Sequence, residues 1–377
     1  MVNHLSRNHS KKRSRMGSKK RSRMGSKKRS RMGSKRIKNK KSQKAGGKIN
    51  IPKTTPTASN GRGDESHNGI LIIPDGTIEI TKEQFKNRED IKKVVIPEGV
   101  TNIGDYAFRA CINLVSVVIP KSVTNIGDYA FAYCSSLASV VIPKSVKSIG
   151  IEAFAYCSSL ASVVIPEGVK TIRKGAFSFC TRLASVMIPE GVKTIEFGAF
   201  YGCTSLASVM IPEWVTDIGD YAFSQCSSLA SVVIQEGVKS IGDSAFSFCS
   251  SLASVVIPEG VTYIGGSAFH GCNNLASVVI PKSVESIGYR AFYQCTNLAS
   301  VVIQEGVKSI GYSAFSGCSS LASVVIPDSV ESIGNGAFDA CSSLKSIIVS
   351  SNTHRDKDSF KTMIKGTGLE KVKVMEK

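Results

Sequence analysis

The sequence predicts a repeat solenoid, a fold in which short coils stack into an elongated array. From residue 70 onward the chain repeats every 23 residues, and eleven units share the pattern SLASVVIPxxVxxIGxxAFxxC. A unit this short cannot close a hydrophobic core of its own, so neighbouring units must bury one another's apolar side chains. The most regular positions are a phenylalanine, at Phe108, Phe131, Phe154, Phe177, Phe200, Phe223, Phe246, Phe269, Phe292, Phe315 and Phe338, and a cysteine three residues later, at Cys111, Cys134, Cys157, Cys180, Cys203, Cys226, Cys249, Cys272, Cys295, Cys318 and Cys341.

The first half of each unit predicts one parallel β-strand. In one unit, Leu137, Val140 and Ile142 follow the spacing LxxVxI, and the last two alternate as in a strand with one buried face. Pro143 then ends the strand, because it has no N–H group to donate. Strands of successive units are expected to lie about 4.8 Å apart and to form a parallel sheet along one side of the array.

The second half of each unit predicts a turn or one short helical turn. Ala153, Phe154 and Cys157 are spaced i, i+1 and i+4, which places their side chains on the same side of a helical turn. The phenylalanines and cysteines are therefore expected to form a structural core ladder through the array. An alternative for the cysteines is disulfide or metal ligation. An odd number of thiols in identical surroundings favours buried structural thiols instead.

Both ends of the array depart from the pattern, as the ends of a solenoid must. Residues 70–93 keep Phe85 but carry polar residues where alanine and cysteine stand elsewhere, so they predict an N-terminal capping repeat. The repeat array is expected to span residues 94–349. Residues 350–377 predict a C-terminal cap with a closing strand. Leu369, Val372 and Val374 repeat the strand pattern, each 25 residues after its equivalent in the last full unit.

Residues 1–69 are a separate, strongly basic segment that ends in a Gly, Pro, Ser and Thr-rich linker. The segment contains three copies of SKKRSRMG and 22 Lys and Arg residues, against two acidic residues. With so few apolar side chains, it is expected to be disordered. It predicts contacts with nucleic acid or another polyanion, a nuclear address, or a solubilising tail. The residues that would carry the first two roles are Lys11, Lys12, Arg13, Arg15, Lys19, Lys20, Arg21, Arg23, Lys27, Lys28, Arg29 and Arg31.

The repeats predict neither an enzyme nor a metal site, and no cofactor is expected. Catalysis needs different groups that converge at one place, whereas the units offer the same residues eleven times. No two histidines on an ordered element have metal-ligand spacing. No apolar run approaches the roughly 18 residues that a membrane span needs. The N-terminus lacks the apolar segment of a secretory signal, so an intracellular location, in the nucleus or the cytoplasm, is expected.

Binding contacts are expected where the units differ, because packing fixes the positions that they share. The position before the cysteine is aromatic in three successive units, and nearby turn positions add further rings. These rings form the candidate protein-interaction surface, and the alternative is neutral variation at tolerant positions. A second apolar row, of Val141 and its equivalents, is expected on the outward strand face beside a row of serines. The candidate aromatic residues are Tyr133, Tyr156, Phe179, Phe197, Tyr201 and Trp214.

The units resemble leucine-rich repeats of the BspA-like type, whose pattern is similar to LxxVxIPxxVxxIGxxAFxxCxx. The resemblance covers residues 70–349. It implies a right-handed, curved solenoid that binds proteins or surfaces. The expected function is therefore a non-enzymatic interaction scaffold that binds a protein partner through the solenoid, with a basic tail that contacts polyanions or serves as a nuclear address. The alternative is a BspA-like cell-surface adhesin or antigen, exported by another route.

Overall fold

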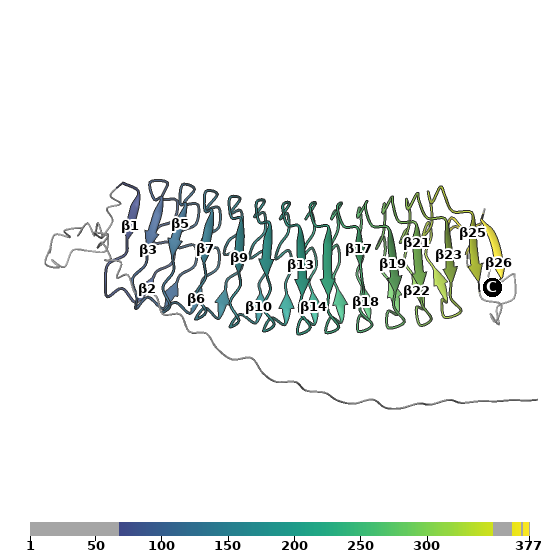
Figure 1. Ribbon diagram of the computed structural model, residues 1–377, viewed down its shortest axis with the longest axis horizontal. Coiled ribbons are helices and arrows are strands. Elements are labelled where there is room, and N and C mark those ends of the chain that lie inside the picture. The colour runs from purple at the N-terminus through teal and green to yellow at the C-terminus, as the bar shows by residue number, and fades with distance from the viewer. Residues whose placement is uncertain (1–67, 350–363, 371, 377) are drawn as a thin grey trace, which may run out of the picture. The chain divides into compact units, whose positions relative to one another are not determined.

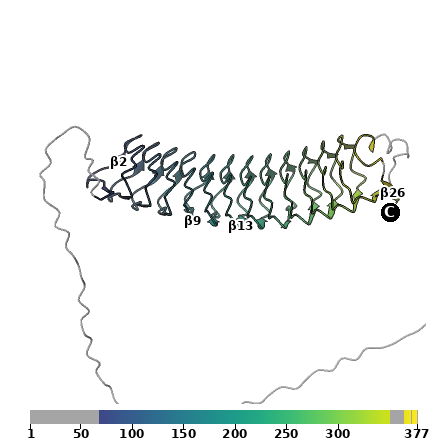
Figure 2. The same ribbon diagram turned by 90° about the horizontal axis from the view of Figure 1, so that it is seen from above.

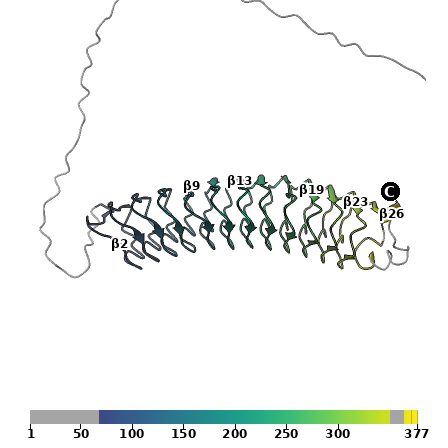
Figure 3. The same ribbon diagram turned by 90° about the horizontal axis from the view of Figure 1, so that it is seen from below.

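The computed structural model describes residues 68–349, 364–370 and 372–376. The predictions for the basic clusters between Lys11 and Arg31 therefore lie outside the described residues. The described part is an array of stacked coils, most of which have two short strands (Figure 1). The array curves gently along its length (Figure 2, Figure 3). It is the predicted curved solenoid of parallel strands.

The first strand of each coil is the one that the sequence predicts. Val140 points into the core, while Ser139 and Val141 on either side of it point outward. The strands pair in parallel at the repeat distance, so that Ser116 lies opposite Ser139. These strands are β1 (Ile70–Ile72), β3 (Lys93–Val95), β5 (Ser116–Val118), β7 (Ser139–Val141), β9 (Ser162–Val164), β11 (Ser185–Met187), β13 (Ser208–Ile211), β15 (Ser231–Ile234), β17 (Ser254–Val255), β19 (Ser277–Ile280), β21 (Ser300–Ile303), β23 (Ser323–Ile326), β25 (Ser346–Val349) and β26 (Lys373–Glu376).

A second strand of two residues follows in the coils from β1 to β23, and the sequence does not predict it. Ile149 points inward from it and Ser148 is partly exposed. These strands also pair in parallel, so that Thr171 lies opposite Thr194. They are β2 (Glu79–Ile80), β4 (Asn102–Ile103), β6 (Asn125–Ile126), β8 (Ser148–Ile149), β10 (Thr171–Ile172), β12 (Thr194–Ile195), β14 (Asp217–Ile218), β16 (Ser240–Ile241), β18 (Tyr263–Ile264), β20 (Ser286–Ile287), β22 (Ser309–Ile310) and β24 (Ser332–Ile333).

The segment after the second strand is a run of turns and not a helix. Its N–H groups alternate between two directions. The N–H of Ala155 bonds to the carbonyl of Glu152 in the same coil, whereas the N–H of Phe154 bonds to the carbonyl of Ala176 in the next coil. Glu152 and Tyr156 have φ angles of 50° and 61°, in the left-handed region that interrupts a right-handed helix. The sequence predicts either a turn or one short helical turn in this segment, and the structure has turns. Hydrogen bonds to the next coil replace the hydrogen bonds that a helix would make.

A row of phenylalanine rings runs through the centre of the array. From Phe85 to Phe338, rings of neighbouring coils stack with centroids 5.2 to 5.6 Å apart. The rings are buried together with the leucine, valine, isoleucine and cysteine positions of the repeat, in one continuous cluster. Each inner ring packs against two coils, so this row joins the units into a single core.

The C-terminal end is closed by a strand, in a register that differs from the predicted one. Val374 of β26 lies opposite Ile347 of β25, whereas the sequence pattern predicted Val372 at that place. Side chains alternate along a strand with a period of two, so a slip of two residues keeps the same set on each face. Just before the strand, the buried Thr367 accepts the N–H of Phe338 with its carbonyl and covers the last turn.

Candidate interaction surfaces

The cysteine row belongs to the core and offers no reactive thiol. Each thiol donates a hydrogen bond to a phenylalanine carbonyl of the preceding coil, as Cys226 Sγ does to Phe200 at 3.3 Å. All eleven cysteines are buried and free of disulfides. Burial raises the pKa of Cys180 and Cys226 to about 12. Nucleophilic and metal-binding cysteines act as thiolates, so this row is suited to packing rather than to chemistry.

The described residues contain no group of three or more His, Cys, Asp or Glu side chains that could hold a metal ion. His270 lies between the rings of Phe248 and Tyr293, at centroid distances of 4.6 and 5.0 Å. Burial lowers its pKa, which favours a neutral imidazole that packs as a ring. Over the same described ranges, no helix is long and apolar enough to cross a membrane.

Most of the candidate aromatic residues do come together in the turn region of successive coils. Tyr133 stacks on Tyr156 with centroids 4.5 Å apart, and Tyr156 stacks on Phe179 at 4.6 Å. Tyr201 then meets Phe179 edge-on, at 5.0 Å and an interplanar angle of 90°. The stacked rings therefore form one contiguous surface across neighbouring coils.

One further ring, which the sequence reasoning missed, completes this surface. Tyr221 contacts Phe197 at 5.3 Å and Tyr201 at 6.5 Å. It occupies a different repeat position from Tyr133, two residues before the core phenylalanine. The signal that could have found it is the aromatic pair at that same position in earlier units, Tyr106 and Tyr129. We call the whole group the aromatic ledge, which consists of Tyr133, Tyr156, Phe179, Phe197, Tyr201 and Tyr221.

Three rings of the aromatic ledge stand where the backbone suits glycine better. The φ angles of Tyr133, Tyr156 and Phe179 are 63°, 61° and 56°, and Gly202 and Gly271 occupy the same position in other coils. A bulky residue in this region costs about 1–2 kcal/mol relative to glycine. Stacking returns about 0.5–1.5 kcal/mol per pair. The row therefore brings little net stability to the turn, whose left-handed backbone recurs in the other coils.

The faces of the stacked rings are covered, so a partner can reach mainly their edges. Tyr156 covers one face of Tyr133, and the guanidinium of Arg109, from the preceding coil, lies 5.1 Å from the centroid of that ring. Phe179 lies between Tyr156 and Tyr201. Binding of nucleic-acid bases by stacking needs a free aromatic face. The ledge instead presents ring edges, tyrosine hydroxyls and a guanidinium, which are typical of protein-binding hot spots.

Trp214 is the candidate that the structure does not bring to the ledge. It lies in the turn between β13 and β14, whereas the ledge lies in the turns that follow the second strands. Its side chain is 56% exposed, and no ring within the described residues packs on it. The candidate surface therefore consists of the aromatic ledge without Trp214.

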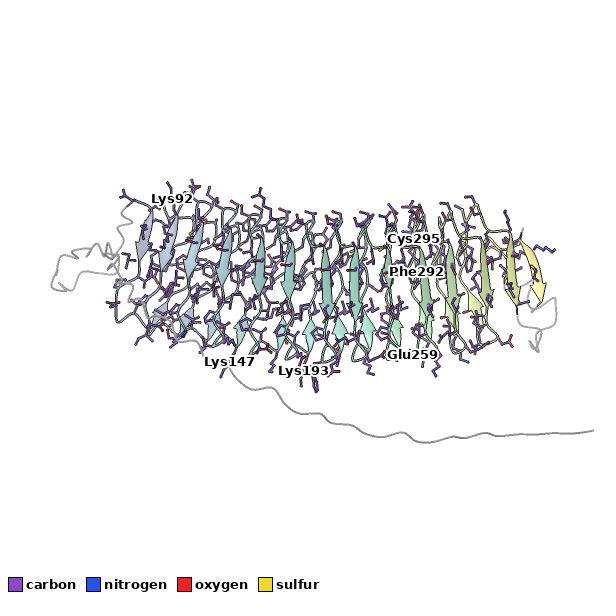
Figure 4. The ribbon with its side chains drawn as sticks, in the orientation of Figure 1. Lys92, Lys147, Lys193, Glu259, Phe292 and Cys295 are labelled. Carbon is purple, nitrogen blue, oxygen red and sulfur yellow. The ribbon has the colours of Figure 1, made fainter. Side chains whose placement is uncertain are left out.

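The outward face of the first strands is a second, apolar surface. Val141 is 78% exposed, and an exposed valine or methionine stands at this position in every coil from Val118 to Val302. Charged side chains border this face. Lys147, Lys193 and Glu259 lie along one long edge of the array and Lys92 along the other, with Phe292 and Cys295 between the edges (Figure 4). We call this surface the strand face.

Known proteins share this architecture. A family model described as "BspA type Leucine rich repeat region (6 copies)" matches residues 69–184, 170–297 and 264–377. No curated relative matches the chain. The structure of a leucine-rich repeat protein from Bacteroides ovatus ATCC 8483 is similar, with 27% identity and a TM-score of 0.61, over 82% of this chain and 92% of that one. A leucine rich cell surface protein from Faecalibacterium prausnitzii A2-165 is 30% identical with a TM-score of 0.52, over 82% of this chain and 88% of that one.

Proposed function

Because the chain belongs to the BspA-type leucine-rich-repeat family, we propose that it is a non-enzymatic binding scaffold, displayed at a cell surface, that holds a protein partner on its aromatic ledge. The repeated coils supply a long, rigid support. The core positions are the same in nearly every coil, whereas the turn positions differ. A surface that varies on a constant framework is suited to recognition.

The observation that carries this proposal is the continuous row of aromatic rings at the aromatic ledge. Other coils hold glycine, alanine or glutamine at the left-handed position before the cysteine, as at Gly202, Ala110 and Gln225. Three coils in succession hold aromatic residues there, Tyr133, Tyr156 and Phe179. Their row is continuous with Tyr201. Tyrosine and other aromatic residues dominate binding hot spots, because they bury a large area at a small cost in conformational entropy.

Similarity to a cell surface protein supports a surface location. This is the alternative that the sequence left open, and it has more support than the intracellular location. The free cysteines are compatible with a surface location. Their thiols are buried in the core, where oxidants and thiol–disulfide exchange reagents do not reach them. Detection of the intact protein on unpermeabilised cells, and its removal by external protease, would test the location.

For the basic tail, we propose contact with polyanions. At a cell surface, a chain segment with 22 Lys and Arg residues would be attracted to anionic polymers or lipids without needing a folded site. The clusters between Lys11 and Arg31 lie outside the described residues, so this proposal depends on charge alone. A nuclear address is the competing role, and a surface location would exclude it.

The ledge is tested by replacing its strained rings with a residue that the chain itself uses at that position. Gln225 and Gln294 hold the left-handed conformation in two other coils. The triple variant Tyr133→Gln, Tyr156→Gln and Phe179→Gln should therefore keep the fold. Extracellular proteins that bind the immobilised wild-type chain in a purified panel should bind this variant at least 30-fold more weakly, as expected when hot-spot rings are removed.

The matched control is Phe248→Gln, which changes the same repeat position outside the ledge. This variant should retain the affinity of the wild-type chain for the same partner. Equal affinity of the wild type and the triple variant, with unchanged circular dichroism, would contradict the ledge as the binding surface. A loss of affinity in both variants would point to a general effect on the array.

A further inference from the structure

The strand face is apolar over a length that soluble proteins rarely leave uncovered. Its central members are between 50% and 78% exposed in six consecutive coils. Single exposed apolar residues are common, but contiguous patches of several hundred Å² mark interaction surfaces. These central members are Val141, Val164, Met187, Met210, Val233 and Val256.

The strand face is also smooth and uncharged. In β7, the outward side chains are Ser139 and Val141, and the exposed Ala138 precedes them. The strand segments of the following coils repeat alanine, serine and valine or methionine at these positions. Between Ser139 and Val302 no lysine or glutamate stands at these outward strand positions to keep another sheet away, and lysines such as Lys93 and Lys345 stand only toward the ends of the face; natural proteins commonly use such charges against association. Two sheets with small outward side chains can pack about 10 Å apart.

The spacing of the Val and Met side chains along the strand face indicates which partner fits it. Each row advances by one side chain per coil, at the parallel strand spacing of about 4.8 Å. A partner that fills the gaps between successive valines must repeat at the same distance over many coils. A second copy of this chain has that repeat. We propose that the strand face is a self-association surface, on which two copies pack face to face with their Val and Met rows interlocked.

The available area is of the size that a stable dimer needs. A valine or methionine side chain carries roughly 60–120 Å² of apolar surface. A row from Val118 to Val302, about half to three-quarters exposed, therefore presents on the order of 500 Å² per molecule. The flanking alanine and serine rows bring this toward the about 800 Å² that each partner contributes to a standard interface. A twofold arrangement would bury the same face of both copies.

Sedimentation equilibrium of the full chain tests this proposal. The wild type should form dimers at micromolar concentration. The variant Met187→Lys and Met210→Lys should be monomeric, with a dimer dissociation constant raised more than about 100-fold, because packing would bring unpaired like charges together. Both side chains point outward, so the circular dichroism and the urea midpoint should not change.

The matched control is Thr216→Lys and Thr262→Lys. It adds the same charge at exposed positions where neighbouring coils naturally carry Lys193 and Lys239, and it should dimerise like the wild type. A wild-type chain that is monomeric at 100 µM, as an order-of-magnitude limit for a standard interface, would overturn the proposal. So would a dimer that persists in the Met187→Lys and Met210→Lys variant. Neither result depends on the partner of the aromatic ledge, which lies on another surface.

Discussion

The ring of Phe179 lies against Gly202, the residue that occupies its position in the next coil. A Cβ atom on Gly202 would come 2.9 Å from Cδ1 of Phe179, so only glycine leaves room for the ring. The same relationship recurs between Phe248 and Gly271. The stacked part of the aromatic ledge ends at this glycine, and Tyr201 turns edge-on to Phe179.

Replacing Gly202 by alanine should therefore destabilise the array for two reasons. The left-handed φ of 71° costs a residue with a Cβ about 1–2 kcal/mol, and displacement of the Phe179 ring adds about 1–2 kcal/mol of overpacking. The measurement is urea unfolding, followed by the fluorescence of Trp214, the single tryptophan. Gly76→Ala is the control, since Gly76 has a φ of 85° and no atom within 4 Å of the added Cβ. It should lose only the backbone contribution, and equal losses would argue against the ring contact.

Replacing Phe223 by alanine should open a cavity in the middle of the array. Its ring stacks on Phe200 at 5.2 Å and on Phe246 at 5.4 Å. Loss of a buried phenylalanine costs about 3–5 kcal/mol. The cavity here would weaken the packing of this coil against both of its neighbours. Phe85→Ala should cost less, because in the described residues that ring stacks on Phe108 alone. Thermal and urea unfolding of the two variants compare them, and an equal loss at both positions would mean that the end coil is packed as tightly as the middle.

The stability of the array should decrease as pH rises above about 9. Burial raises the pKa of Cys111 to about 11, and of Cys180 and Cys226 to about 12, from an ordinary value of 9.0. In this window the unfolded state binds fewer protons than the folded state. Each thiol then lowers the free energy of unfolding by up to about 1.4 kcal/mol per pH unit until its folded pKa is reached. Below pH 9 the thiols are protonated in both the folded and the unfolded state, so they do not lower the free energy of unfolding.

The experiment is urea unfolding at pH 8, 9 and 10 under reducing conditions. A variant with Cys180→Ala, Cys203→Ala and Cys226→Ala removes three of the thiols. Between pH 9 and 10 the free energy of unfolding of this variant should fall less steeply than that of the wild type. The difference between the two slopes should be up to about 4 kcal/mol per pH unit for three thiols. Identical slopes for wild type and variant would show that these buried thiols do not govern the alkaline loss.

Deletion of residues 1–69 should remove sequence-independent binding to polyanions. The segment carries 22 Lys and Arg residues and no aromatic residue that could stack on bases. Binding of the full chain to duplex DNA, used as a model polyanion, should therefore weaken steeply with salt, with a log–log slope of about −0.9 per neutralised phosphate. Fluorescence anisotropy at several salt concentrations measures the slope. Binding that survives in residues 70–377 would place the contact on the solenoid instead.

The sequence by itself determined the stacked array and its buried rows. A 23-residue unit is too small to hold a core alone, so positions such as Phe154 and Cys157 had to be covered by the same positions of neighbouring coils. The first strand followed from the alternation of Val140 and Ile142. These conclusions depend only on repeated, local patterns, and such patterns are fully visible in one chain.

Only the tertiary structure decided the features that depend on contacts between coils. The second strand has two residues, too few to show alternation in the sequence, and it exists because Ile149 pairs with Ile126 of the preceding coil. The left-handed turns arise because every other N–H, such as that of Phe154, bonds to the neighbouring coil. Tyr221 joins the aromatic ledge while Trp214 does not, since residues at different repeat positions meet only when coils are stacked in register. That register is set by hydrogen bonds across the whole array, and no single unit contains them.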